Sequence, residues 1–195
     1  YTRAHSAGRV LFLLDVSGSM SGDDKLTRAQ AAVDRALDLK NPADIVGVQA
    51  VPSSPTDPRD PVTLVPFTSG DLDAVRAAVH RTAPLDEGAA LYDALASAVG
   101  AMRSPGAPAR QAIVVLTDGE DLSGGRGLST RTAESLKGLV AGGPPVPIQV
   151  IAFSPASCRD PGLAQVARDS GGQCLADGNL NQAVARAVAG VWGGG

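Results

Sequence analysis

The chain has 195 residues, of which 44% are hydrophobic and 3% aromatic, and its formal net charge at pH 7 is −3. This composition indicates a globular domain with a core of Val, Leu, Ile and Ala, and it excludes an intrinsically disordered chain. The sequence has no run of Lys and Arg to neutralise phosphates and no apolar stretch of membrane-spanning length, so it predicts neither a nucleic-acid partner nor a membrane span. We expect a single domain over residues 1–195, with its core at about 8–192, excised from a larger protein.

Short, continuously apolar runs alternate with helical patterns along the chain. These runs predict strands at 10–16, 44–51, 111–117 and 146–153, with a weaker strand at 172–176. Strands that are apolar on both faces are typical of a parallel sheet that is covered by helices on each side.

A further strand, at 62–67, is reached through a proline-rich connection that contains Pro52, Pro55, Pro58 and Pro61. Proline at this density excludes a crossover helix. A parallel neighbour requires a long crossover, whereas an antiparallel neighbour can follow a loop. We therefore expect the strand at 62–67 to be antiparallel and to lie at an edge of the sheet.

Apolar residues spaced by three and four predict helices between the strands. They form stripes at 26–37, 72–79, 91–102 and 180–191, with further helices at 130–140 and 163–169. The predicted fold is an α/β doubly wound open sheet of six strands, mostly parallel with one antiparallel edge strand, and with helices on both faces.

Oxygen-bearing side chains follow two of the predicted strands. Asp15 lies at the end of the first predicted strand, Ser17 and Ser19 come directly after it, and Asp118 comes after the strand at 111–117. In an open α/β sheet, ligands bind beyond the carboxyl ends of the strands. Carboxylate and hydroxyl oxygens are hard ligands that suit Mg²⁺, Mn²⁺ or Ca²⁺. Asp and Ser after a strand are also common helix caps, but two such groups after two strands favour a metal site over caps.

Four segments resemble von Willebrand factor A domains. LFLLDVSGSM at 11–20 resembles the first-strand signature of that family, with D-x-S-x-S at Asp15, Ser17 and Ser19, and VVLTDGED at 114–121 is similar to the fourth-strand motif, with its aspartate at Asp118. ALYDAL at 90–95 resembles the start of the helix after the family's threonine loop, and SGGQCLAD at 170–177 resembles its last strand.

This resemblance implies a sheet of order 3-2-1-4-5-6 and a metal-ion-dependent adhesion site. In such a site the two serines hold the ion directly, the two aspartates hold it through water, and an acidic side chain of a partner protein completes the coordination. The expected function is therefore protein binding and adhesion. The loops around Glu87 and at 120–126 would shape the specificity.

The chain departs from the family at one ligand. Ala89 stands where the family commonly has a threonine, in G-T-x-L, and alanine offers no oxygen. Asp86 or Glu87, in the same loop, are candidates to replace that ligand. The departure leaves open a second function, a structural or interaction module of the same fold that has lost its metal dependence.

An enzyme is not expected. Phosphatases that use an aspartate after the first strand need a second aspartate two residues later, where this chain has Ser17. They also need a positioned lysine, but Lys25, Lys40 and Lys137 lie on predicted helices or at their ends. His80 lies in an amphipathic helix, and the G-x-G-x-x-G and P-loop motifs are absent from the sequence.

The chain has two cysteines, Cys158 and Cys174. Both lie near predicted strand ends, so we favour a disulfide, which would be worth roughly 3 kcal/mol, over two buried free thiols. A disulfide would indicate an extracellular or cell-surface location, and free thiols would leave the cytoplasm open. Abundant Ala, Gly, Arg and Pro with few Lys suggest a bacterial source.

Overall fold

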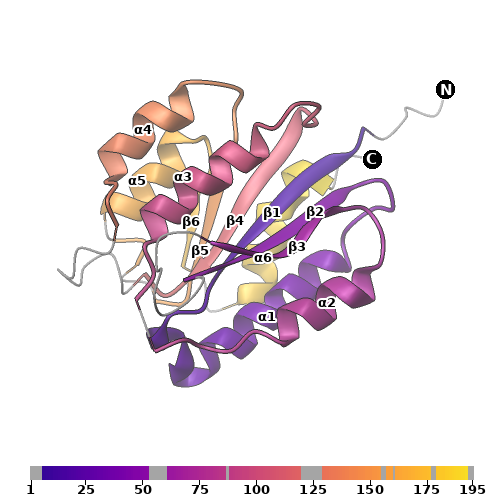
Figure 1. Cartoon of the computed structure of the whole chain (residues 1–195), viewed down its shortest axis with the longest axis horizontal. Coiled ribbons are helices and arrows are strands. Elements are labelled where there is room, and N and C mark those ends of the chain that lie inside the picture. Colours follow the sequence, from indigo (N-terminus) through magenta and orange to yellow (C-terminus); the bar gives the residue numbers. More distant parts are fainter. Residues whose placement is uncertain are drawn as a thin grey trace.

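The computed structural model describes residues 6–52, 61–86, 88–119, 129–154, 157–159, 161–176 and 179–192. Within these residues, six strands form one sheet of order β3-β2-β1-β4-β5-β6 (Figure 1). The strands are β1 (Gly8–Asp15), β2 (Ile45–Val51), β3 (Val62–Thr68), β4 (Arg110–Thr117), β5 (Ile148–Ala152) and β6 (Cys174–Leu175). Neighbouring strands are parallel except β2 and β3, which are antiparallel. The predicted doubly wound sheet and its antiparallel edge strand are confirmed.

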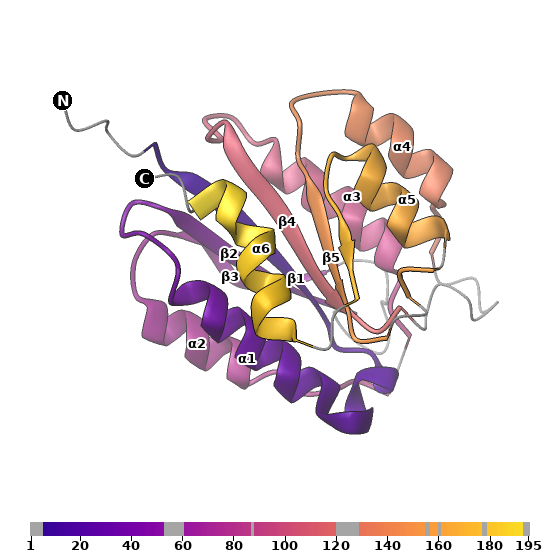
Figure 2. The ribbon, with the colours of Figure 1, turned by 180° about the vertical axis from the view of Figure 1, so that it is seen from behind.

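Helices cover both faces of the sheet (Figures 1 and 2). One face packs against α1 (Lys25–Leu37), α2 (Leu72–His80) and α6 (Leu180–Trp192), and the other packs against α3 (Leu91–Met102), α4 (Ala133–Ala141) and α5 (Pro161–Asp169). A 3₁₀ helix, η1 (Gly18–Asp24), joins β1 to α1. None of the helices in the described ranges has the length and apolarity needed to cross a membrane.

Two hydrophobic cores, one on each face of the sheet, explain why β1 is apolar from Val10 to Leu14. Phe12 faces α6, where its ring meets the Trp192 ring edge-on at a centroid distance of 6.1 Å, whereas Leu11 and Leu13 face the core under α3. Every residue of β1 is buried. A strand with helices on both sides has no solvent face, so it needs no alternating polar residues.

Some predicted elements are shorter in the structure, and the strand expected at 146–153 spans only Ile148–Ala152. The helix expected at 130–140 begins at Ala133, because the Thr132 side chain accepts a hydrogen bond from the Ser135 amide and caps the helix. Thr130 instead donates to Asp93 of α3. The last strand is reduced to Cys174–Leu175.

The structure contains the disulfide between Cys158 and Cys174, with an S–S distance of 2.08 Å. This bond ties the segment that follows β5 to the edge strand β6. The segment also carries Ser157, which lies beside the site described next.

The strand order places the carboxyl ends of β1 and β4 side by side. Leu14 pairs with Leu116 in the parallel register, so the residues that follow both strands emerge at the same edge of the sheet. From β1 the sheet continues to β2 on one side and to β4 on the other. This is the topological switch point, where ligands bind in open α/β sheets.

Candidate metal centre

The loop after β1 is built around the Asp15 carboxylate, which is buried. Its Oδ1 atom accepts hydrogen bonds from the Ser17 amide at 2.9 Å and from the Ser17 hydroxyl at 2.6 Å. Ser17 occupies the N-cap position of η1, but its side chain makes no capping hydrogen bond. The hydroxyl is therefore directed towards the cluster around Asp15 and not towards the helix end.

Hydrogen bonds connect this loop to the end of β4. The hydroxyls of Ser17 and Ser19 lie 3.2 Å apart, and the Ser19 hydroxyl donates to Asp118 Oδ1 at 3.0 Å. The side chain of Asp118 is also buried, with 1% of its surface exposed. The structure therefore brings the four side chains selected from the sequence into one connected cluster.

Three further residues, which the sequence analysis did not select, contact this cluster. The Thr117 hydroxyl donates to Asp15 Oδ2 at 2.5 Å and accepts from the Gly119 amide at 2.9 Å. The Ser157 hydroxyl donates to the Asp118 carbonyl. Lys25 Nζ lies 2.7 Å from Asp118 Oδ2 and donates to the Ser19 carbonyl at 3.2 Å. Thr117 could have been selected from the sequence, because its hydroxyl directly precedes Asp118. The local sequence gives no such indication for Ser157 or Lys25.

Burial raises the pKa of Asp15 to about 6 from an ordinary value of 3.8. Hydrogen bonds from Ser17 and Thr117 act in the opposite direction, and the nearby charge of Asp118 adds to the increase. An ionised carboxylate without bulk water is stabilised by a nearby positive charge. The environment of Asp15 therefore favours a bound cation.

The donor set fits a hard divalent cation. It consists of two carboxylates and two hydroxyls, and the residues that the structure describes contain no group of three or more His, Cys, Asp or Glu side chains that could hold a metal. Zinc and copper prefer nitrogen and sulfur ligands, whereas Mg²⁺ uses one or two carboxylates with neutral oxygens and water. The side chains present therefore fit Mg²⁺ or Mn²⁺.

The segment at 82–86 adjoins the site. The Leu85 amide donates to the Val16 carbonyl at 2.7 Å, and a β-carbon added at Gly18 would lie 3.6 Å from Asp86 Oδ1. Asp86 is exposed, while Ala89 is buried and packs against the core under α3. Of the expected specificity loops, Glu87 and residues 120–126 lie outside the described residues.

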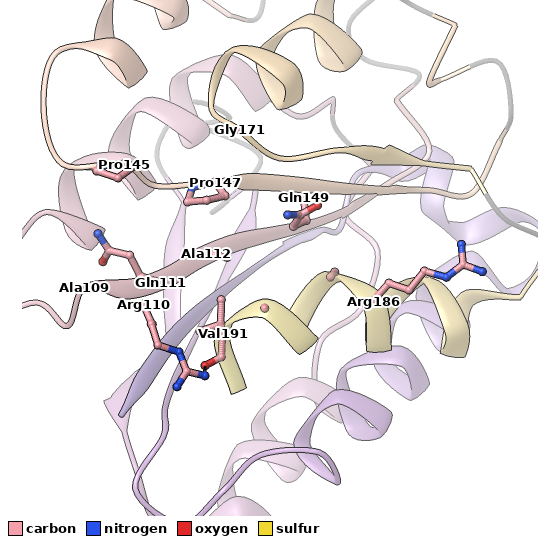
Figure 3. A pocket seen from close by; sticks show the side chains of 12 residues that line it. Ala109, Arg110, Gln111, Ala112, Pro145, Pro147, Gln149, Gly171, Arg186 and Val191 are labelled. Atoms are coloured by element: carbon pink, nitrogen blue, oxygen red, sulfur yellow. Dashed lines mark hydrogen bonds between the residues drawn. The ribbon is translucent and has the colours of Figure 1, made fainter. Parts of the chain in front are cut away.

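A cavity of about 340 Å³ lies at the opposite end of the sheet, between the start of β4 and the end of α6 (Figure 3). Arg110 is turned towards the last turn of α6 and donates to the carbonyls of Val191 and Ser6. Gln149 accepts from the Gln173 amide at 3.1 Å. These polar side chains make hydrogen bonds within the fold, and the cavity is lined by none of the residues of the cluster around Asp15.

Comparison with known proteins assigns the family. Residues 10–120, more than half of the chain, match the sequence model of the von Willebrand factor type A domain. The chain belongs to this family. No sequence among curated proteins matches it.

Solved structures share the fold of this von Willebrand factor type A domain. An aerotolerance-related membrane protein from Bacteroides fragilis NCTC 9343, carrying multiple mutations to serines, is 21% identical with a TM-score of 0.70, and the match covers 93% of this chain and 96% of that one. A von Willebrand factor type A protein from Catenulispora acidiphila is 19% identical, with a TM-score of 0.66 and coverages of 93% and 41%. The pilus adhesin SpaC from Lactobacillus rhamnosus GG is 11% identical, with a TM-score of 0.67 and coverages of 94% and 30%. The chain thus spans nearly all of the first structure and less than half of the other two.

Proposed function

We propose that this von Willebrand factor type A domain is a non-enzymatic protein-binding module with a metal-ion-dependent adhesion site. Asp15, Ser17, Ser19 and Asp118 would hold Mg²⁺ or Mn²⁺, through which the domain captures an acidic side chain of a partner protein. The observation that supports this most strongly is the convergence of four oxygen-bearing side chains from the neighbouring ends of β1 and β4.

The arrangement of the side chains suits binding. When bound, the metal supplies a positive charge that attracts a carboxylate of the partner. Thr117 and Ser17 orient Asp15 through hydrogen bonds, so the site is organised before the partner arrives. The histidine that the structure describes, His80, contacts Asp34 at 2.7 Å on the exposed side of α2 and α1, so it offers no base to the serines of the site.

We place this function outside the cell or at its surface. Disulfides persist in oxidising compartments and are rare in the cytosol of most organisms. The Cys158–Cys174 bond agrees with that location, and the names of two structural neighbours, a membrane protein and a pilus adhesin, are consistent with it.

Calorimetric titration with Mn²⁺ tests the metal site. The variant Ser17→Ala/Ser19→Ala should bind at least about tenfold more weakly than the wild-type domain, since each tenfold change corresponds to about 1.4 kcal/mol. Ser21→Ala is the matched control, because the exposed Ser21 hydroxyl donates to the Gly18 carbonyl within the same loop. Equal loss of binding in the control, or equal affinity in all three proteins, would contradict the proposed ligands.

Selection of phage-displayed peptides in the presence of Mn²⁺ tests the capture of a carboxylate. Selected peptides should contain an acidic residue, and replacing that residue by its amide, or adding EDTA, should abolish binding. Peptides whose binding survives both changes would contradict capture through the metal.

Restoring the family's threonine should strengthen metal binding. Ala89→Thr adds a hydroxyl at the position that the family uses as a ligand, so we expect Mn²⁺ affinity to increase by about tenfold. Ala89→Val is the control, since valine has nearly the same shape as threonine without the oxygen. Equal Mn²⁺ affinities of the two variants by calorimetry would show that residue 89 is not at the ligand position.

A metal-independent interaction module is the second candidate function. It is favoured by Ala89, which lacks a ligand oxygen, and by the Lys25 ammonium, which already pairs with Asp118. The Mn²⁺ titration separates the two functions. The second one predicts that the wild-type domain does not bind at millimolar Mn²⁺ and that selected peptides bind equally in EDTA.

A further inference from the structure

Lys25 places a positive charge against the proposed metal ligands. It is the first residue of α1, and its Nζ lies 2.7 Å from Asp118 Oδ2 and 3.2 Å from the Ser19 carbonyl. The lysine side chain is 16% exposed and the Asp118 side chain is 1% exposed, so this ion pair is largely shielded from water. Shielding makes the charge interaction stronger than that of a surface pair.

The backbone before Lys25 adopts an unfavourable conformation. Asp23 and Asp24 have φ values of 52° and 53°, in the left-handed region that residues other than glycine rarely adopt. Asp24 occupies the N-cap of α1 without a side-chain capping bond. In addition, a lysine in the first turn of a helix is opposed by the helix dipole. These unfavourable features lie together at the point where the chain directs Lys25 towards Asp118.

Both carboxylate oxygens of Asp118 have a donor. Oδ1 accepts from the Ser19 hydroxyl, and Oδ2 accepts from the Lys25 ammonium. A divalent cation held by Ser17, Ser19 and Asp118 would lie close to this ammonium, and like charges at short range repel each other. The ammonium and a metal ion therefore compete for the negative charge of Asp118.

We propose that Lys25 is a built-in counter-cation of Asp118, which balances this carboxylate in the metal-free domain and lowers the affinity of the site for divalent metal. This proposal rests on the proposed metal-binding function. It makes metal loading an exchange of cations: the ammonium moves away from Asp118 when the metal is bound. Half-occupancy of the site then requires a higher concentration of divalent metal than the same ligands would require without Lys25.

A double-mutant cycle in metal-free buffer tests the pairing. The variants are Lys25→Met, Asp118→Asn and the combination of both, and denaturant unfolding is the measurement. The second substitution should be markedly less destabilising once the first is present, because each single variant leaves one partner of the pair without its counter-charge. Additive effects would overturn the counter-cation role.

Mn²⁺ calorimetry tests the competition. Lys25→Met keeps most of the aliphatic length and should bind Mn²⁺ roughly tenfold or more tightly than the wild type. The control is Lys137→Met, which makes the same change in net charge at an exposed position of α4. Equal or weaker binding by Lys25→Met, with normal wild-type binding, would overturn this proposal and leave the metal function intact. Binding by Lys25→Met alone would support the competition and contradict metal loading of the wild type, and binding by neither protein would contradict both.

Discussion

The Asp15→Asn variant is expected to lose metal affinity and to gain stability in metal-free buffer at pH 7.5. Asparagine keeps the Oδ1 acceptor for Ser17, and the Thr117 hydroxyl has lone pairs that can accept from the new amide. The substitution removes a buried charge, whose cost corresponds to roughly 3 kcal/mol for a pKa raised to about 6. Loss of the carboxylate should weaken Mn²⁺ binding by roughly 100-fold.

The stability gain should depend on pH with a defined sign. In the wild type, the folded state holds the Asp15 proton up to about pH 6, whereas the unfolded state releases it near 3.8. The protonated Asp15 therefore contributes fully to the free energy of unfolding below pH 3.8, and this contribution is lost as the pH rises through about 6. Urea unfolding of both proteins from pH 4 to 7.5 measures this. The control Asp73→Asn, at an exposed position, should show no such trend. A constant stability difference between Asp15→Asn and wild type would contradict the burial argument.

The Gly119→Ala variant is expected to be strongly destabilised and to lose metal affinity. Gly119 has a φ of +72°, and an added β-carbon would lie 2.8 Å from the Ser157 β-carbon. The left-handed conformation costs alanine roughly 1–2 kcal/mol, and overpacking adds about 1–3 kcal/mol. Relief of the clash would displace either Ser157 or Asp118, whose carbonyl accepts from the Ser157 hydroxyl. Mn²⁺ binding should therefore weaken along with stability.

Gly106→Ala separates the two contributions. Gly106 has a φ of +78° with no atom within 4 Å of an added β-carbon, so this substitution carries the conformational cost without the clash. Thermal or denaturant unfolding should rank the proteins as wild type, Gly106→Ala and then Gly119→Ala in decreasing stability. Equal loss in the two variants would contradict a clash between the added β-carbon at position 119 and Ser157.

The four candidate ligands could be predicted from the sequence because their positions depend on local patterns and one topological rule. Asp15 ends one largely apolar strand and Asp118 directly follows another, and parallel strands that neighbour each other end at the same edge of a sheet. The antiparallel direction of β3 also had a local cause, the prolines that precede it. These signals require no knowledge of side-chain packing.

Lys25 and Ser157 could not be predicted in this way. The direction of Lys25 depends on two consecutive left-handed aspartates, and neither residue is a glycine that would have marked such a turn. Ser157 lies 39 positions after Asp118 and comes to it through the segment that the disulfide ties to β6. Contacts of this kind depend on the tertiary structure, so local sequence patterns do not predict them.

Anomalous diffraction from a crystal of the wild-type domain grown in excess MnCl₂ would locate a metal ion bound between the ends of β1 and β4. We predict a manganese peak bounded by the hydroxyls of Ser17 and Ser19 and by the Asp118 carboxylate, with the Lys25 ammonium withdrawn from Asp118. A crystal in which these side chains point apart, with solvent between them and no manganese peak, would contradict the proposed site.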